Sequence, residues 1–330
     1  MVNLARFKPL TIMQKFFFIP LLLYLSLSLH SQSLRFGIGS CAAGGDGNND
    51  DIFQTLEKER LDHFLWLGDN AYYTEKDWKN EESMLAAMQQ RHASPLLASF
   101  LQSTPQLAIW DDHDFGPNDS DSSFAQAAAS AKVFEKTWPD NPTNLATNGD
   151  LRWDLRMGSV LFVGLDDRTH RGPKGTQILG KGQLQYLRDL LDIHRDAAWV
   201  FIAVGSQVLN EAEVFENYSR FPERETFLSI CQDHTGQVIF LTGDRHHGEI
   251  NQSQRGSLVE ITSSPLTSRS HMPSAGELKA NVNLIKGTVI STQHYTVIEL
   301  SEDGLAAEVI FKDAKGMELL VYSLQAQGLE

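Results

Sequence analysis

Four short apolar runs in this chain are each followed directly by a cluster of polar side chains. Each run has the length and composition of a buried strand. In open α/β sheets, ligands bind at the carboxyl ends of the strands, so we expect the four clusters to meet along one edge. The clusters are Ser40-Cys41 after FGIG, Gly68-Asp69-Asn70 after HFLWL, Asp111-Asp112-His113-Asp114 after QLAIW, and Gly243-Asp244-Arg245-His246-His247 after VIFLT.

Helix-like segments separate these runs, which indicates an α/β architecture. Amphipathic spacing predicts helices over 51–60, 81–101, 122–136, 181–195 and 224–233. Further strands are predicted at 34–40 and 198–204 and as a hairpin over 151–166. From residue 257 onward the pattern changes to strands and turns, ending in a hairpin over 305–322. We expect this tail to form a second, antiparallel-rich sheet packed on the first.

The N-terminus has the pattern of a secretory signal peptide over residues 1–33. Lys8 and Lys15 precede a short apolar run, FFFIPLLLYLSLSL, and small residues follow at Ser31 and Ser33. An uncleaved anchor is the alternative, but the run is short for a membrane span and contains Pro20. We therefore expect a secreted or periplasmic protein without a stable membrane span after cleavage. No repeat or linker divides the remainder, so we expect one catalytic domain over 34–330.

The formal net charge of −14 argues against nucleic acid as the main partner. A protein that binds the phosphate backbone needs a basic surface, and none is evident here. A phosphate-containing small molecule or lipid is still compatible with this charge, because bound cations convert a carboxylate-rich pocket into an anion site.

Taken singly, each polar cluster also fits a structural role. Gly-Asp-Asn after a strand is common in turns and helix caps, and the acids of WDDHD fit a solvated loop. Together the clusters are harder to explain in that way. Asp111, Asp112 and Asp114 repel one another unless they are solvated or neutralised by cations. Carboxylate, imidazole and thiolate groups are ligands for divalent and trivalent metals, so the joint pattern favours a metal site.

In these motifs the chain resembles the alkaline phosphatase D (PhoD-like) branch of the metallophosphoesterases. The resemblance covers nearly the whole chain after the signal peptide, in order and in spacing. One departure is that Gly205-Ser206-Gln207 stands where other metallophosphoesterases carry a middle histidine motif. The residues that carry the resemblance are GSC at Gly39–Cys41, GDNAY at Gly68–Tyr72, WDDHD at Trp110–Asp114, DDRTHR at Asp166–Arg171 and GDRHH at Gly243–His247.

The resemblance implies a four-layer αββα sandwich, with two mixed sheets flanked by helices. It also implies Fe3+ and Ca2+ as cofactors, with a pair such as Zn2+ or Mn2+ as the alternative. A thiolate and a phenolate suit ferric iron, whereas hard carboxylate oxygens suit calcium. The implied metal ligands are Cys41, Asp69, Tyr72, Asp112, Asp244 and His246, with Asp112 at the second metal and His246 as a ligand or a substrate contact.

The implied activity is hydrolysis of phosphate monoesters or diesters by a metal-activated hydroxide. His113 is expected to protonate the leaving group or to orient the phosphate. Arg168 is expected to contact the phosphoryl oxygens, because guanidinium matches phosphate bidentately, and a surface salt bridge is the alternative. The residues expected to bind substrate are Asn70, Arg171, Arg245 and His247.

Several alternatives stay open at this stage. Cys41 and Cys231 form a disulfide in one interpretation, and Cys41 is a metal ligand in the one that we favour. A phosphodiesterase or phospholipase-type enzyme acting on lipids or polymers uses the same metals. From another class, a surface binding protein that retained the fold is the non-enzymatic alternative.

Overall fold

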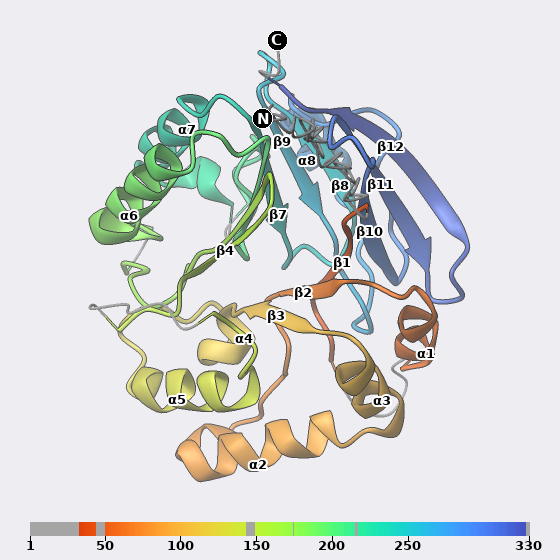
Figure 1. Ribbon diagram of the computed structural model, residues 1–330. Helices are drawn as coiled ribbons and strands as arrows, with labels where there is room; N and C mark the ends of the chain where they lie inside the picture. Colours follow the sequence, from red (N-terminus) through yellow and green to blue (C-terminus); the bar gives the residue numbers. More distant parts are fainter. Residues whose placement is uncertain (1–32, 44–49, 143–148, 174, 215–216, 328–330) are drawn as a thin grey trace, which may run out of the picture. The chain divides into compact units, whose positions relative to one another are not determined.

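The computed structural model describes residues 33–43, 50–142, 149–173, 175–214 and 217–327 (Figure 1). Apart from its last residue, the predicted signal peptide lies outside these described residues. Within them, no helix is both long enough and apolar enough to cross a membrane.

Two six-stranded sheets form the centre of the described chain. Parallel pairing joins β1, β2 and β3 in the first sheet and β5, β6, β7 and β9 in the second. The first sheet has the order β12 (Glu318–Gln325), β11 (Ala306–Asp313), β10 (His294–Leu300), β1 (Arg35–Gly39), β2 (His63–Leu67) and β3 (Gln106–Ile109). The second has the order β4 (Trp153–Met157), β5 (Val160–Gly164), β6 (Trp199–Ala203), β7 (Gln237–Thr242), β9 (Leu258–Thr262) and β8 (Glu249–Gln252).

The C-terminal strands do not form a sheet of their own, so that expectation was wrong. β8 and β9 extend the second sheet beyond β7, whereas β10, β11 and β12 extend the first sheet beyond β1. β10 pairs antiparallel with β1, with Arg35 opposite Glu299. The local pattern shows that a segment is a strand, but the partner of each strand is chosen by tertiary packing.

Side chains that alternate along the strands divide the interior into layers. On β2, Leu65 and Leu67 face the core between the two sheets, whereas Phe64 and Trp66 face the helices. On β6, Phe201 packs in the same inter-sheet core. The strands are therefore buried on both faces, which explains their nearly continuous apolar sequences.

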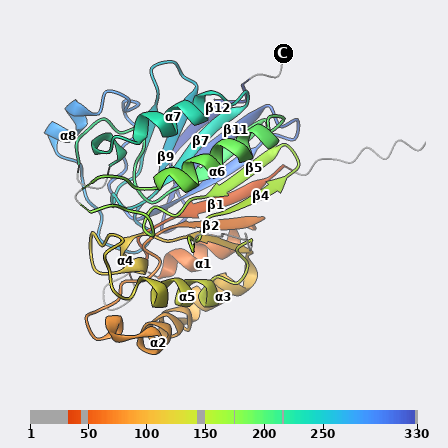
Figure 2. The ribbon, with the colours of Figure 1, turned by 90° about the vertical axis from the view of Figure 1, so that its left-hand side faces the viewer.

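Helices cover the outer face of each sheet, which confirms the four-layer arrangement (Figures 1 and 2). α6 (Gly180–Ile193) and α7 (Arg224–Gln232) pack on the second sheet. α1 (Asp51–Lys58), α3 (Pro95–Ser103) and α5 (Ala127–Thr137) pack on the first. The remaining helices are α2 (Glu81–His92), which packs with α5, and the short α4 (Asp112–Phe115) and α8 (Ala275–Ala280).

The helix predicted over 81–101 is two helices, α2 and α3, in the structure. Pro95 occupies the first turn of α3, where its missing N–H costs no hydrogen bond. The residue before a proline disfavours helical geometry, and Ser94 has φ −57° and ψ 126°. The chain therefore breaks at this point although the apolar spacing continues.

Candidate metal centre

The polar clusters lie together where the parallel strands of both sheets end. The backbone of Ala42, after β1, donates a hydrogen bond of 2.9 Å to the Asp69 carbonyl, after β2. Leu266, after β9 of the second sheet, donates one of 2.8 Å to the Ser40 carbonyl. Backbone contacts thus bind the loops of the two sheets into one rim.

Left-handed backbone conformations gather at this rim. Cys41, Asp69, Asp244 and His246 have φ values of 56°, 54°, 60° and 55°. They are four of the six non-glycine residues with positive φ in the described chain. Holding a non-glycine residue in this backbone conformation costs on the order of 1–3 kcal/mol, so the conformation persists only where the surrounding structure enforces it. The strain therefore falls on residues that the sequence predicts as metal ligands.

Asp69 joins the first group of potential metal ligands, together with Cys41 and His246. Their ligand atoms all lie within 4.8 Å of one another. The Cys41 sulfur is 3.6 Å from Asp69 Oδ2, and the Tyr72 hydroxyl donates to the same oxygen at 2.9 Å. The Tyr72 hydroxyl also lies 3.4 Å from His246 Nε2. Thiol, carboxylate, phenol and imidazole therefore surround one point.

A second group contains the same aspartate with Asp112 and His113, and its ligand atoms also lie within 4.8 Å of one another. The backbone N–H of His113 donates to Asp69 Oδ1 at 3.3 Å and to Asp112 Oδ1 at 2.9 Å. The His113 ring packs against Tyr72, with ring centroids 4.3 Å apart. Asp69 is therefore the carboxylate that the two groups share.

Electrostatics at this point favour a cation. Burial, with Asp112 and Cys41 nearby, raises the pKa of Asp69 well above its usual range. Burial also raises the pKa of the Cys41 thiol to about 12, although the Ser264 hydroxyl opposes the shift. Buried acids that retain their protons lack a compensating positive charge. A metal ion supplies that charge in place of the protons, so the donor set fits a metal centre.

The ring orientation of His246 is set by its second nitrogen. Nδ1 lies 2.7 Å from the backbone carbonyl of Arg269, which accepts only, so Nδ1 carries the proton. Nε2 then has a free lone pair, and it is this atom that faces Tyr72. A histidine held by a carbonyl through its other nitrogen is the usual arrangement of a metal ligand.

Of the acids in WDDHD, only Asp112 faces the centre. Asp114 caps the start of α4 by accepting from the backbone N–H of Asp111 at 3.0 Å, and it accepts from the Asn70 N–H at 3.0 Å. Asp111 is fully buried and pairs with Arg168. Although burial acts in the opposite direction, Arg168 and His113 hold the pKa of Asp112 below its ordinary value. Asp112 is thus the acid of this string that lies beside Asp69.

Arg168 differs from both of its expected roles. Its side chain is fully buried, so it forms no surface salt bridge. Its Nε donates to Asp111 Oδ1 at 2.6 Å and its Nη2 contacts the same oxygen, so the guanidinium is paired with Asp111 inside the fold. The pair joins the loop after β3 to the loop after β5.

The other predicted substrate residues have different surroundings. Asn70 donates its amide to the Ile109 carbonyl at 2.9 Å, and its buried Oδ1 has no hydrogen-bond partner among the described residues. Arg171 is buried, with its guanidinium over the Phe221 ring at 5.3 Å. Arg245 lies at the rim and donates to Glu277 of α8 at 2.6 Å. These three residues belong to neither ligand group.

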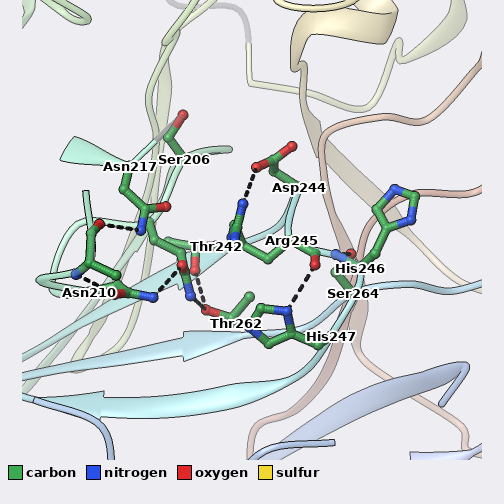
Figure 3. A network of polar contacts seen from close by, with 12 residues as sticks. Ser206, Asn210, Asn217, Thr242, Asp244, Arg245, His246, His247, Thr262 and Ser264 are labelled. Carbon is green, nitrogen blue, oxygen red and sulfur yellow. Dashed lines mark hydrogen bonds and ion pairs between the residues drawn. The ribbon is translucent and has the colours of Figure 1, made fainter. Parts of the chain in front are cut away.

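His247 points away from the centre (Figure 3). Its side chain is fully buried, with Nδ1 2.9 Å from the Arg245 carbonyl and Nε2 3.2 Å from Glu249 Oε2. This placement differs from the expected substrate contact, because no face of the imidazole reaches solvent. The chain bends here, with His246 in a left-handed conformation, and His246 and His247 have unlike surroundings.

Asp244 lies beside the two ligand groups and belongs to neither. Its side chain is 18% exposed, and its carboxylate is 4.0 Å from Arg245 Nη1. Its charge contributes to the raised pKa of Cys41, so it is close enough to act on the centre.

The structure shows where the two cysteines and the Gly205-Ser206-Gln207 segment lie. Cys41 and Cys231 are both buried free thiols, and Cys231 lies in the core around α7, so the disulfide is absent. Gly205 lies against Asp111, because a Cβ there would be 2.6 Å from the Asp111 carboxylate carbon. Gln207 donates to Glu249 at 2.6 Å, away from the ligand groups. The segment in place of the middle histidine motif therefore supports the core.

Two residues at the site were not predicted. Ser264 contacts Cys41, and Arg269 holds His246 through its carbonyl. Ser264 follows β9 as the other clusters follow their strands, so its position was the available signal. It was missed because serine is not a typical metal ligand.

Comparisons with known proteins relate this chain to a family and to solved structures of the same fold. A family model described as PhoD-like phosphatase matches residues 36–310. The solved structure of PhoD is 17% identical, with a TM-score of 0.71, covering 90% of this chain and 70% of that chain. Comparison with the curated proteins gave no match.

Two further solved structures share the fold. The purple acid phosphatase PPD1 from yellow lupin seeds is 12% identical, with a TM-score of 0.64, covering 89% of this chain and 54% of that chain. A dimetal phosphatase from Danio rerio is 14% identical, with a TM-score of 0.56, covering 88% of this chain and 98% of that chain.

Proposed function

The chain belongs to the PhoD-like phosphatase family and is thus a metal-dependent phosphoric ester hydrolase. We propose that it cleaves phosphate monoesters and diesters at a two-metal centre bridged by Asp69. The single observation that carries the proposal is that two groups of potential ligands share this carboxylate. Paired metals are a common device for clamping the attacking and leaving oxygens of a phosphoryl group.

The donor chemistry supports Fe3+ at one position and Ca2+ at the other. Cys41 and Tyr72 would hold the iron together with Asp69 and His246, because thiolate and phenolate stabilise the ferric state. Asp112 would hold the calcium with the other oxygen of Asp69, because calcium prefers carboxylate oxygens. Asp244 would complete the coordination from the rim. A pair such as Zn2+ or Mn2+ is the alternative for the same residues.

Metal ions bound there supply Lewis acidity, which polarises the phosphoryl oxygens and makes the attacking water more acidic. The side chains around them would orient the substrate. Arg245, next to Asp244, would bind the phosphate, and the Oδ1 of Asn70, which has no hydrogen-bond partner among the described residues, would bind the attacking water. His113, at the mouth beside Tyr72, would protonate the leaving oxygen or orient the phosphate.

We propose a small-molecule or lipid phosphate ester as the substrate and export through the N-terminal segment as the route to it. The net charge of −14 disfavours a nucleic-acid partner. The basic and apolar pattern of residues 1–33 supports a cleaved signal peptide. Sequencing the N-terminus of the protein recovered from the cell envelope tests the cleavage.

The activity is tested with p-nitrophenyl phosphate and bis-p-nitrophenyl phosphate as model monoester and diester. We expect hydrolysis by the purified protein, loss of hydrolysis after chelation and dialysis, and recovery when metal is returned. Metal analysis of the same sample should find iron and calcium. Full activity in protein shown to contain no metal would contradict the proposal.

A further inference from the structure

Ser264 connects two of the proposed metal ligands through one hydroxyl group. It follows β9 and is fully buried. Its oxygen lies 3.1 Å from the Cys41 sulfur and 2.9 Å from the backbone nitrogen of His246. Cys41 and His246 belong to the loops after β1 and β7, so the hydroxyl joins loops of the two sheets. Figure 3 shows Ser264 beside His246.

The chemistry of these groups determines the direction of both hydrogen bonds. The His246 N–H can only donate, so the Ser264 oxygen accepts from it. The single hydroxyl proton of Ser264 then remains for the sulfur, which is a weak acceptor. Ser264 is therefore a hydrogen-bond donor to Cys41.

Ser40 provides a natural comparison, because its hydroxyl also lies near this sulfur. The distance from Ser40 Oγ to Cys41 Sγ is 3.6 Å, but the Ser263 carbonyl is 3.0 Å away. A carbonyl oxygen is the stronger acceptor, so the Ser40 proton is directed to it. Two buried serines thus lie beside one cysteine, and only Ser264 directs its proton at the sulfur.

We propose that Ser264 is a positioning residue that tunes the metal–thiolate bond of Cys41. A hydrogen bond to a ligating sulfur withdraws electron density from it, and such bonds adjust the properties of metal–thiolate sites. The same oxygen holds the His246 backbone in its left-handed conformation, which orients a second ligand. The inference rests on the proposed function, in which Cys41 and His246 bind a metal.

Cobalt provides a probe that is independent of turnover. The full mature chain is freed of metal, loaded with Co2+ alone, and examined for the thiolate-to-cobalt charge-transfer band. The dissociation constant for Co2+ is measured by competition with a chelator. Cys41→Ser identifies the band, Ser264→Ala and Ser264→Gly remove the donor, Ser264→Thr restores a hydroxyl, and Ser40→Ala is the matched control.

We expect Ser264→Ala to shift the band to lower energy, because a sulfur without the hydrogen bond is more easily oxidised. Co2+ binding should weaken about tenfold, the lower end of the range for groups that support a ligand. Ser40→Ala should leave the band where it is, and Ser264→Thr should return it. If Ser264→Ala does not fold, Ser264→Gly is expected to show the same shift.

An unchanged band in both Ser264→Ala and Ser264→Gly, or an equal shift in Ser40→Ala, would overturn the role of Ser264 while leaving Cys41 as a ligand. Absence of any band that depends on Cys41 would overturn both the ligand assignment and this inference. The two failures are therefore distinguishable in one set of spectra.

Discussion

Asp69 organises the candidate centre because its two carboxylate oxygens face different partners. Oδ2 contacts Cys41 and Tyr72, whereas Oδ1 accepts from the backbone of His113. The left-handed conformation of Asp69 directs the carboxylate into the space between these groups.

The two cysteines should behave differently. Cys41→Ser should shift or erase the visible charge-transfer band of the iron-loaded protein, because a hydroxyl is a much poorer ligand than a thiolate and only the Tyr72 phenolate would then contribute to it. Cys231→Ala should retain the band, because Cys231 packs in the apolar core around α7. Absorption spectra and iron content of both variants provide the measurement. A band that survives Cys41→Ser would exclude the thiolate as its source.

Asp112 and His113 should separate metal binding from turnover. Asp112→Ala should lose the second metal and nearly all turnover, with a loss greater than the roughly 10–100-fold typical of residues that only support ligands. His113→Ala should keep most metal, because the carboxylate ligands remain, and should lose about 100-fold or more in kcat. Metal analysis and steady-state kinetics decide between the two effects.

The control for this pair is Asp192→Ala, which removes an acid whose side chain is 57% exposed on α6. It should keep both metal and rate. An Asp112→Ala protein with full metal content and a normal rate would mean that WDDHD is a solvated loop.

Buried polar contacts connect the loops that follow β3 and β5, and these contacts hold the edge of the first sheet against the second. Trp110 Nε1 donates to Asp166 Oδ1 at 2.7 Å, next to the ion pair of Asp111 and Arg168. Because both side chains of this ion pair are fully buried, water does not solvate either charge when the other side chain is removed.

Arg168→Ala should lower the free energy of unfolding by about 3–5 kcal/mol, the usual cost of breaking a buried ion pair from one side. Arg195→Ala, which breaks an exposed pair with Asp192, should cost less than about 1 kcal/mol. Urea unfolding of the two metal-free variants compares these costs directly. Equal costs would mean that water reaches the Arg168 pair.

The stability of the folded chain as a whole should depend on pH through its buried histidines. Burial lowers the pKa of His294 to about 4, and its Nε2 has no hydrogen-bond partner among the described residues. The unfolded chain binds this proton at its ordinary pKa of about 6.5, so between these values only the unfolded state is protonated. The free energy of unfolding should therefore fall as the pH drops from about 6.5 to about 4.

The contribution of His294 is on the order of 3 kcal/mol, because each unit of pKa shift corresponds to about 1.4 kcal/mol. Denaturant unfolding of the metal-free protein across this pH range provides the measurement and excludes effects of metal release. His294→Gln should flatten the dependence, whereas His271→Gln, at an exposed position, should leave it unchanged. An equally steep dependence in His294→Gln would assign the proton to another group.

The sequence by itself was sufficient for the α/β class and for the family resemblance that implies the four-layer fold. Short apolar runs identify buried strands, and ligands bind where parallel strands end, so the polar clusters containing Cys41, Asp69, Asp112 and His246 were expected to meet at one edge. The signal is local in each case, because a strand and the polar residue after it are adjacent in the chain.

Only the tertiary structure decided which sheet each C-terminal strand joins and which way neighbouring side chains point. The pattern of β10 is the same whether it pairs with β1 or with β9, and the choice depends on packing between distant segments. Arg168 turned inward to Asp111, and His247 turned to Glu249, although its neighbour His246 belongs to a ligand group. Burial and pairing of charges depend on contacts across the fold, because the free energy of a charged group is set by the partners that surround it in three dimensions.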